Sequence, residues 1–159
     1  PDAQQHFQMA IQADPFNPQY HIALGTALCQ QREWIQGLAQ YMALDPGKDK
    51  DLVNRESRVT MEHIQKELAA GKTFDSKGWL AIGIYHVKID HDLQAAIEAF
   101  KKSAALDPAQ ADAWFDLGSL YEATHNPQAA KAAYEKLLAL PQATEFQKNF
   151  AAQHAAALK

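Results

Sequence analysis

Residues 79–86 read WLAIGIYH, and residues 114–121 read WFDLGSLY. In both segments a tryptophan is followed, three, four and seven positions later, by an aliphatic residue, a glycine and an aromatic or histidine residue. The two tryptophans are 35 residues apart, and Phe100 and Tyr134, which follow the two segments, are 34 residues apart. A fixed period of this length is typical of a stacked repeat protein, in which each repeat packs mainly on its neighbours.

Less complete copies of this pattern precede the two strong ones. Residues 18–46 hold the same spacing of three, four and seven positions, in His21, Leu24, Gly25 and Leu28. Residues 1–15 hold only the second part of a unit, in which Phe7 stands 34 residues before Tyr41. Several units close on an Asp-Pro pair, and proline ends a helix because it lacks a backbone N–H and its ring clashes with the preceding turn. These pairs are Asp14-Pro15, Asp45-Pro46 and Asp107-Pro108.

Taken together, these residues resemble the tetratricopeptide repeat family, whose unit is a helix-turn-helix pair. The resemblance covers about residues 1–46 and 76–141 and is strongest in the last two units. It implies an all-α fold, namely an α-solenoid of antiparallel helix pairs that winds into a right-handed superhelix. It also implies a non-enzymatic scaffold that binds other proteins, and it leads us to expect a bacterial source.

The segment 47–75 does not fit the repeat. Gly25 and Gly83 are 58 residues apart, which is ten residues short of two periods of 34. No Gly or Pro interrupts residues 51–70, so one long helix is predicted, although a break near Ser57 would give two short helices. The sequence leaves these alternatives open.

We expect the chain to consist of three parts. An N-terminal block at 1–46 contains a half repeat and one repeat, residues 47–75 form an irregular helical connector, and a C-terminal block at 76–159 contains two repeats. The C-terminal block is expected to end in a capping helix at 143–158, in which Thr144 and Gln147 form a capping box. The residues expected to face inward from this helix are Phe146, Phe150 and Leu158.

The large aromatic residues of the motif are predicted to form the core, where burial of each contributes about 1.5–3 kcal/mol. They are Trp79, Trp114, Phe100 and Tyr134. In the family that this chain resembles, the partner lies in a groove lined by the first helix of each unit. The corresponding positions of this chain are Gln19, Ile22, Thr26 and Cys29, then Lys77, Leu80, Ile84, Val87 and Lys88, and finally Asp112, Phe115, Asp116, Ser119 and Glu122.

Some of these groove positions are apolar although the core of a single repeat does not require it, namely Leu80, Ile84, Val87 and Phe115. Either the groove is open and binds a peptide or a helix, or it is filled by residues 47–75 or by another copy of the chain. A monomer seldom leaves so large an apolar patch bare. Under both alternatives the surface is an interface. The expected partner is a protein or peptide with an apolar or amphipathic segment, and a homo-oligomer remains open.

One branch of the resembled family clamps the carboxyl terminus of heat-shock chaperones with Lys, Asn and Arg along these helices. The corresponding positions here are occupied by Ile22, Thr26, Ala81, Phe115 and Asp116. Because the basic clamp residues are missing, a chaperone tail is disfavoured as the partner.

Composition and motifs exclude several classes of function. The formal net charge of -4 argues against nucleic acid as a partner, and the sequence has no run of about 18 apolar residues that could insert into a membrane. No metal-binding or catalytic motif is present, so we expect no cofactor, no metal and no catalysis within these residues. An alternative is that the repeats recruit partners to an enzyme whose catalytic part lies outside this fragment.

Two features bear on where the protein acts. Cys29 is the only cysteine, which fits the cytoplasm and also permits the periplasm. The chain opens with Pro1 and not with Met, so we expect that upstream sequence has been removed.

Overall fold

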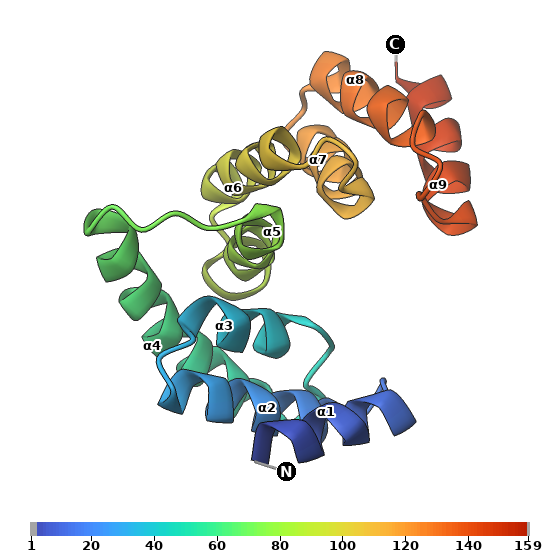
Figure 1. Ribbon diagram of the computed structural model, residues 1–159. Helices are drawn as coiled ribbons and strands as arrows, with labels where there is room; N and C mark the ends of the chain where they lie inside the picture. Colours follow the sequence, from blue (N-terminus) through green and yellow to red (C-terminus); the bar gives the residue numbers. More distant parts are fainter. Residues whose placement is uncertain (1–2, 159) are drawn as a thin grey trace. The chain divides into compact units, whose positions relative to one another are not determined.

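The computed structural model describes residues 3–158, and within them every regular element is a helix (Figure 1). The predicted all-α fold class is therefore confirmed. The helices form two compact units. One unit runs up to Phe74 and includes Lys88–Asp90, and the other consists of Asp75–Val87 and the chain from His91 onward.

The first unit begins with a half repeat and one helix pair. Helix α1 (Ala3–Ala13) packs on α2 (Pro18–Gln30), and α2 packs on α3 (Trp34–Met42). Helix α2 starts where the Asn17 side chain accepts a hydrogen bond from the backbone N–H of Gln19, with Pro18 at the first helical position. No described residue of α1 is fully buried, in keeping with a helix that has a neighbour on one side only.

The segment that breaks the repeat forms one long helix. A short 3₁₀ turn (Gly47–Asp49) leads into α4 (Lys50–Ala69), which packs on α3 without interruption at Ser57. The buried face of α4 runs without a gap through the point where a break was the alternative, in Val53, Ser57, Thr60, Met61 and Ile64. The imidazole of His63 stacks on the Trp34 indole at 4.0 Å between ring centroids and thereby joins α4 to α3.

The second unit contains the two strong repeats and the last helix. Its elements are α5 (Ser76–Tyr85), α6 (Leu93–Leu106), α7 (Ala111–Ala123), α8 (Pro127–Leu138) and α9 (Glu145–Ala157). Most of these helices begin at a side-chain cap, supplied by Asp75, Asp92, Asn126 and Thr144. Successive helices pack on each other from α5 to α9, which is the stacking of helix pairs that defines an α-solenoid.

The motif aromatics contribute unequally to the core. Phe100 and Tyr134 are 1% and 0% exposed and lie inside two apolar clusters of the second unit. Trp114 is half-buried and packs against both clusters. Trp79 is half-buried as well, and the Lys102 ammonium lies 4.1 Å from the centroid of its ring.

The turn inside each helix pair places one residue in the left-handed region of backbone conformation. These residues are Arg32, His91 and His125, with φ values of 63°, 58° and 57°. Between α5 and α6 the chain first widens into a π-helical turn (His86–Asp90). This wider turn takes up the additional residue that lengthens the spacing of the tryptophans to 35.

Candidate functional site

Helix α9 lies against one side of α7. We call this side the α7 face and define it by Asp112, Phe115, Ser119 and Glu122. The ring of Phe115 is 5.2 Å from the ring of Phe150, measured between centroids. Helix α9 packs mainly against α8 and to a smaller extent against α7. Helix α7, the first helix of its unit, packs on α6, the second helix of the preceding unit. Helix α9 packs on α8 in the same way, so α9 occupies the place of the first helix of a further unit.

The buried side of α9 is shifted by one residue along the sequence from the side that was predicted to face inward. Phe146 is 68% exposed, with its ring centroid 6.1 Å from that of Phe115, so the expectation that it faces inward is wrong. The fully buried residues are Gln147 and Ala151, and Phe150 and Leu158 are half-buried against the neighbouring cluster. The helical stripe that meets α7 and α8 therefore runs through Gln147 rather than through Phe146.

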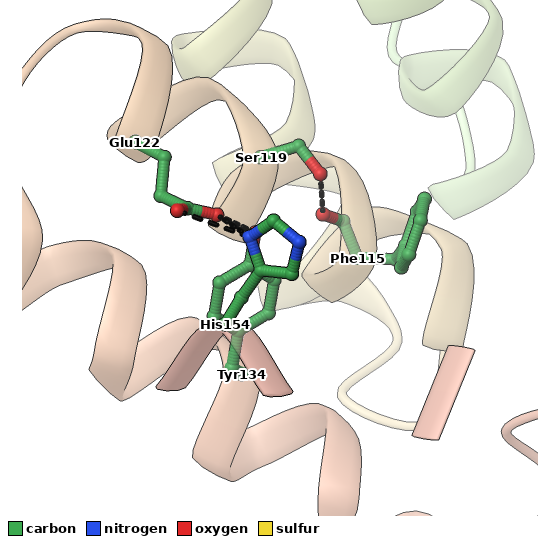
Figure 2. A network of polar contacts seen from close by, with 5 residues as sticks. All are labelled: Phe115, Ser119, Glu122, Tyr134 and His154. Atoms are coloured by element: carbon green, nitrogen blue, oxygen red, sulfur yellow. Dashed lines mark hydrogen bonds and ion pairs between the residues drawn. The ribbon is translucent and has the colours of Figure 1, made fainter. Parts of the chain in front are cut away.

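Polar contacts tie both ends of α9 to the α7 face. The side-chain amide of Gln147 donates a hydrogen bond of 2.7 Å to Asp112. Nδ1 of His154 lies 2.8 Å from a carboxylate oxygen of Glu122, as Figure 2 shows. Gln147 and Asp112 lie in the first turns of α9 and α7, and His154 and Glu122 lie in their last turns. The two helices therefore run parallel.

Glu122 also binds the second helix of its own repeat. The hydroxyl of Tyr134 donates a hydrogen bond of 2.5 Å to the same carboxylate. Burial alone would raise the pKa of Glu122, but the hydrogen bonds from Tyr134 and His154 outweigh it, and the pKa lies below its ordinary value. Burial and the adjacent carboxylate raise the pKa of the Tyr134 phenol, so Tyr134 remains a donor. Glu122 is thus held as a carboxylate at the end of α7.

The apolar positions of α5 correspond to the α7 face. Leu80, Ile84 and Val87 precede Phe115, Ser119 and Glu122 by 35 residues each. They are half-buried and pack against the cluster built by α6 and α7, which includes Leu117 and Leu120. Part of their apolar surface is therefore used inside the second unit.

The remaining predicted groove residues differ in how exposed they are, and they belong to both compact units. Lys77 and Asp112 are exposed, and Asp116 is half-buried, all in the second unit. In the first unit, Lys88 is exposed and donates a hydrogen bond of 3.1 Å to the carbonyl of Met42. The predicted residues of α2 also lie in that unit, where Gln19 and Thr26 are exposed and Ile22 and Cys29 are half-buried.

The hydroxyls around Cys29 and Tyr41 form a small polar group within the first unit. Sγ of Cys29 is 3.4 Å from Oγ1 of Thr60, and the Tyr41 hydroxyl is 3.2 Å from Oγ1 of Thr26. Burial raises the pKa of the Cys29 thiol and raises the pKa of Tyr41 to about 12. Both groups are therefore uncharged at neutral pH.

Sequence reasoning missed His154 and the contact of Gln147 with Asp112. The capping box marked Gln147 only as a residue that stabilises its own helix. The available signal was the spacing of seven residues between Gln147 and His154, which places both on one side of a helix.

A hollow of about 410 Å³ lies on another side of α7, between α6 and α8. It is lined by Trp114, Leu117 and Tyr121 of α7 and also by Lys101 and Lys136. Among the described residues, no three His, Cys, Asp or Glu side chains gather as they would around a metal ion. No helix within residues 3–158 is both long and apolar enough to cross a membrane.

Comparison with known proteins identifies the repeats. Residues 89–153 match the family model described as tetratricopeptide repeat. Superkiller complex protein 3 of Mus musculus is 33% identical over 98 residues, which are 60% of this chain and 6% of that protein. The protein of the same name from Homo sapiens is 32% identical over a segment of the same length. The chain therefore spans only a small part of the curated relatives that it matches, and because both are mammalian, the bacterial source stays a prediction.

Among solved structures, the crystal structure of MamA aligns with 96% of this chain and 82% of its own, at 19% identity and a TM-score of 0.44. Tetratricopeptide repeats generally mediate protein–protein interaction and are typically non-catalytic scaffolds. Together with the stacked helix pairs of the second unit, the match to the family model identifies residues 89–153 as tetratricopeptide repeats.

Proposed function

We propose that this chain is a non-enzymatic scaffold that binds a segment of a partner polypeptide along the first helices of its repeats. One observation supports this proposal above all others: the α7 face already holds a polypeptide segment, the helix α9. It does so with the ring contact of Phe115 to Phe150 and with hydrogen bonds at Asp112 and Glu122. The same face therefore has the apolar centre and the polar ends that an amphipathic helix requires.

The corresponding side of α5 extends the proposed binding surface. Leu80, Ile84 and Val87 keep part of their apolar surface accessible, and the exposed Lys77 lies at the start of the helix. A partner segment with apolar residues and an acidic residue would satisfy these groups. Since Phe115 is in contact with α9, a partner that uses α7 has to share that residue with α9 or replace α9.

The proposal is tested by finding where a bound peptide protects the chain. A displayed library of random peptides is selected on the full chain, and hydrogen–deuterium exchange is measured with and without an enriched peptide. We expect slower exchange in α5 and α7. Protection confined to α6 and α8, which border the hollow lined by Trp114 and Tyr121, would instead place the binding site there.

Self-association is a second candidate, and it is favoured by the exposed apolar residues of the first unit. Met9 on α1 is 61% exposed, and Phe16, which follows α1, is 81% exposed. Burying them against another copy would remove apolar surface from water. Light scattering across concentrations distinguishes this candidate: a dimer in the parent that Phe16→Ser/Met9→Ser converts to a monomer would support it.

Recruitment by a larger protein is compatible with the same binding surface. The matched relatives bear the name of a component of a superkiller complex, and the chain spans 6% of their length. By analogy, these repeats would act as one docking segment of a longer protein.

A further inference from the structure

Helix α9 is held on the α7 face by few buried groups. Its fully buried residues are one polar residue, Gln147, and one small residue, Ala151. By contrast, α8 buries Tyr134 and Leu137 together with two alanines. The half-buried ring of Phe150 makes the nearer of the two aromatic contacts of α9 with Phe115 of α7. Of its own residues, α9 therefore buries less apolar surface than α8 does.

The negative charge of Glu122, at the end of the α7 face, has no permanently charged partner on α9. Glu122 is a carboxylate in the last turn of α7, where the helix dipole disfavours negative charge and favours a cation. Its partner on α9 is His154, which carries a positive charge only when protonated. A permanently charged Arg or Lys at that place would form a stronger, charge-assisted hydrogen bond.

We infer that the α7 face is an exchangeable helix site whose second occupant is a partner helix with an aromatic residue followed four residues later by Arg or Lys. The aromatic residue takes the place of Phe150 against Phe115, and the basic residue takes the place of His154 beside Glu122. The partner helix runs parallel to α7, as α9 does. This inference rests on the proposed function and adds the chemistry and the direction of the partner.

The test uses the full chain with Phe150→Ala, in which α9 has lost its aromatic contact and competes less for the site. The probes are three fluorescent synthetic peptides that correspond to residues 141–158: one unchanged, one with His154→Arg and one with His154→Gln. Binding is measured by fluorescence anisotropy. We expect the Arg peptide to bind about tenfold more tightly than the Gln peptide, a ratio equivalent to about 1.4 kcal/mol.

A second pair of chains assigns the preference to Glu122. In Phe150→Ala/Glu122→Gln, we expect the Arg and Gln peptides to differ by less than about twofold, because the carboxylate is gone. In the control Phe150→Ala/Glu135→Gln, which removes an exposed carboxylate of α8, the tenfold preference should remain.

Equal affinity for the Arg and Gln peptides, a preference that survives Glu122→Gln, or no binding of any peptide would each overturn the inference. The proposed function stands or fails separately, on the exchange pattern that a library-selected peptide gives. If such a peptide protects α5 and α7 while the Arg peptide shows no preference, the scaffold function holds and the predicted partner chemistry is wrong.

Discussion

The ring of Tyr134 lies so close to the backbone of Gly118 that a Cβ added to this glycine would stand 2.8 Å from Cζ of the ring. Phe100 has the same relation to Gly83, also with 2.8 Å to Cζ. In the first unit, a Cβ on Gly25 would be 2.8 Å from Cε1 of Tyr41. In each pair the glycine belongs to the first helix and the ring to the second, so the missing side chain sets how closely the two helices approach.

We therefore predict that Gly83→Ala destabilises the protein by about 1–3 kcal/mol, because the added methyl overpacks the contact with Phe100. Gly83→Leu and Gly118→Leu should lower the melting temperature further, by several degrees. The measurement is thermal unfolding followed by circular dichroism. In a Phe100→Leu background the cost of Gly83→Ala should shrink, and an undiminished cost would show that the ring is not its cause.

Phe150→Ala should loosen α9, whereas Phe146→Ala should not. Phe150 is half-buried and contacts the rings of Phe115 and His154, while Phe146 is 68% exposed. We expect Phe150→Ala to cost about 1 kcal/mol, which is less than the value for a fully buried aromatic residue, and to speed amide exchange in α9. Equal effects of the two substitutions would contradict the placement of α9 on α7.

Glu122→Gln should reduce stability at neutral pH and have little effect in acid. The pKa of Glu122 is lowered in the folded chain, so its stabilising contribution is complete above the ordinary glutamate pKa of about 4.3. This contribution is lost as the pH falls through the lower pKa of the folded state. Urea unfolding at several pH values between 7 and 3 should show the gap between parent and variant closing. Glu135→Gln, which removes an exposed carboxylate of α8, is the matched control.

Cys29 should react slowly with alkylating reagents in the folded protein. Burial raises the pKa of its thiol, and the thiolate is the reactive form. At pH 8, modification by iodoacetamide should be several times slower than that of an exposed thiol introduced by Ala105→Cys in a Cys29→Ser chain. Equal rates would show that Cys29 is accessible, while denaturant should remove the difference.

The repeated motif made the helix pairs predictable because it records contacts between neighbouring helices at fixed spacing. Gly83 and Phe100 could be assigned to the core from their recurrence at Gly118 and Tyr134. The long α4 could not be settled in advance, since helix propensity alone does not distinguish one helix from two. In the structure, α4 packs on α3 and buries one continuous face that includes Val53, Met61 and Ile64.

The contact between α9 and α7 was harder to predict because it depends on residues without a repeat signature. Gln147 and His154 are polar, and their partners Asp112 and Glu122 are 35 and 32 residues away. The one-position error at Phe146 has a similar origin, because in a helix rich in alanine the large apolar residues alone do not define the buried stripe. The groove positions on α2, α5 and α7 stay a prediction until a bound partner is mapped.

Gln147 performs two tasks with one side chain. Its carbonyl oxygen accepts the backbone N–H of Thr144 at 2.9 Å and completes the capping box of α9, while its amide nitrogen is bound to Asp112. Contact with α7 therefore fixes the rotamer that the start of α9 needs, and a formed start of α9 in turn holds the amide toward α7. We therefore expect docking of the last helix and formation of its first turn to be coupled. Release of α9 should consequently be accompanied by fraying of its first turn, so that the helix switches between a docked, capped form and a detached, partly unwound one.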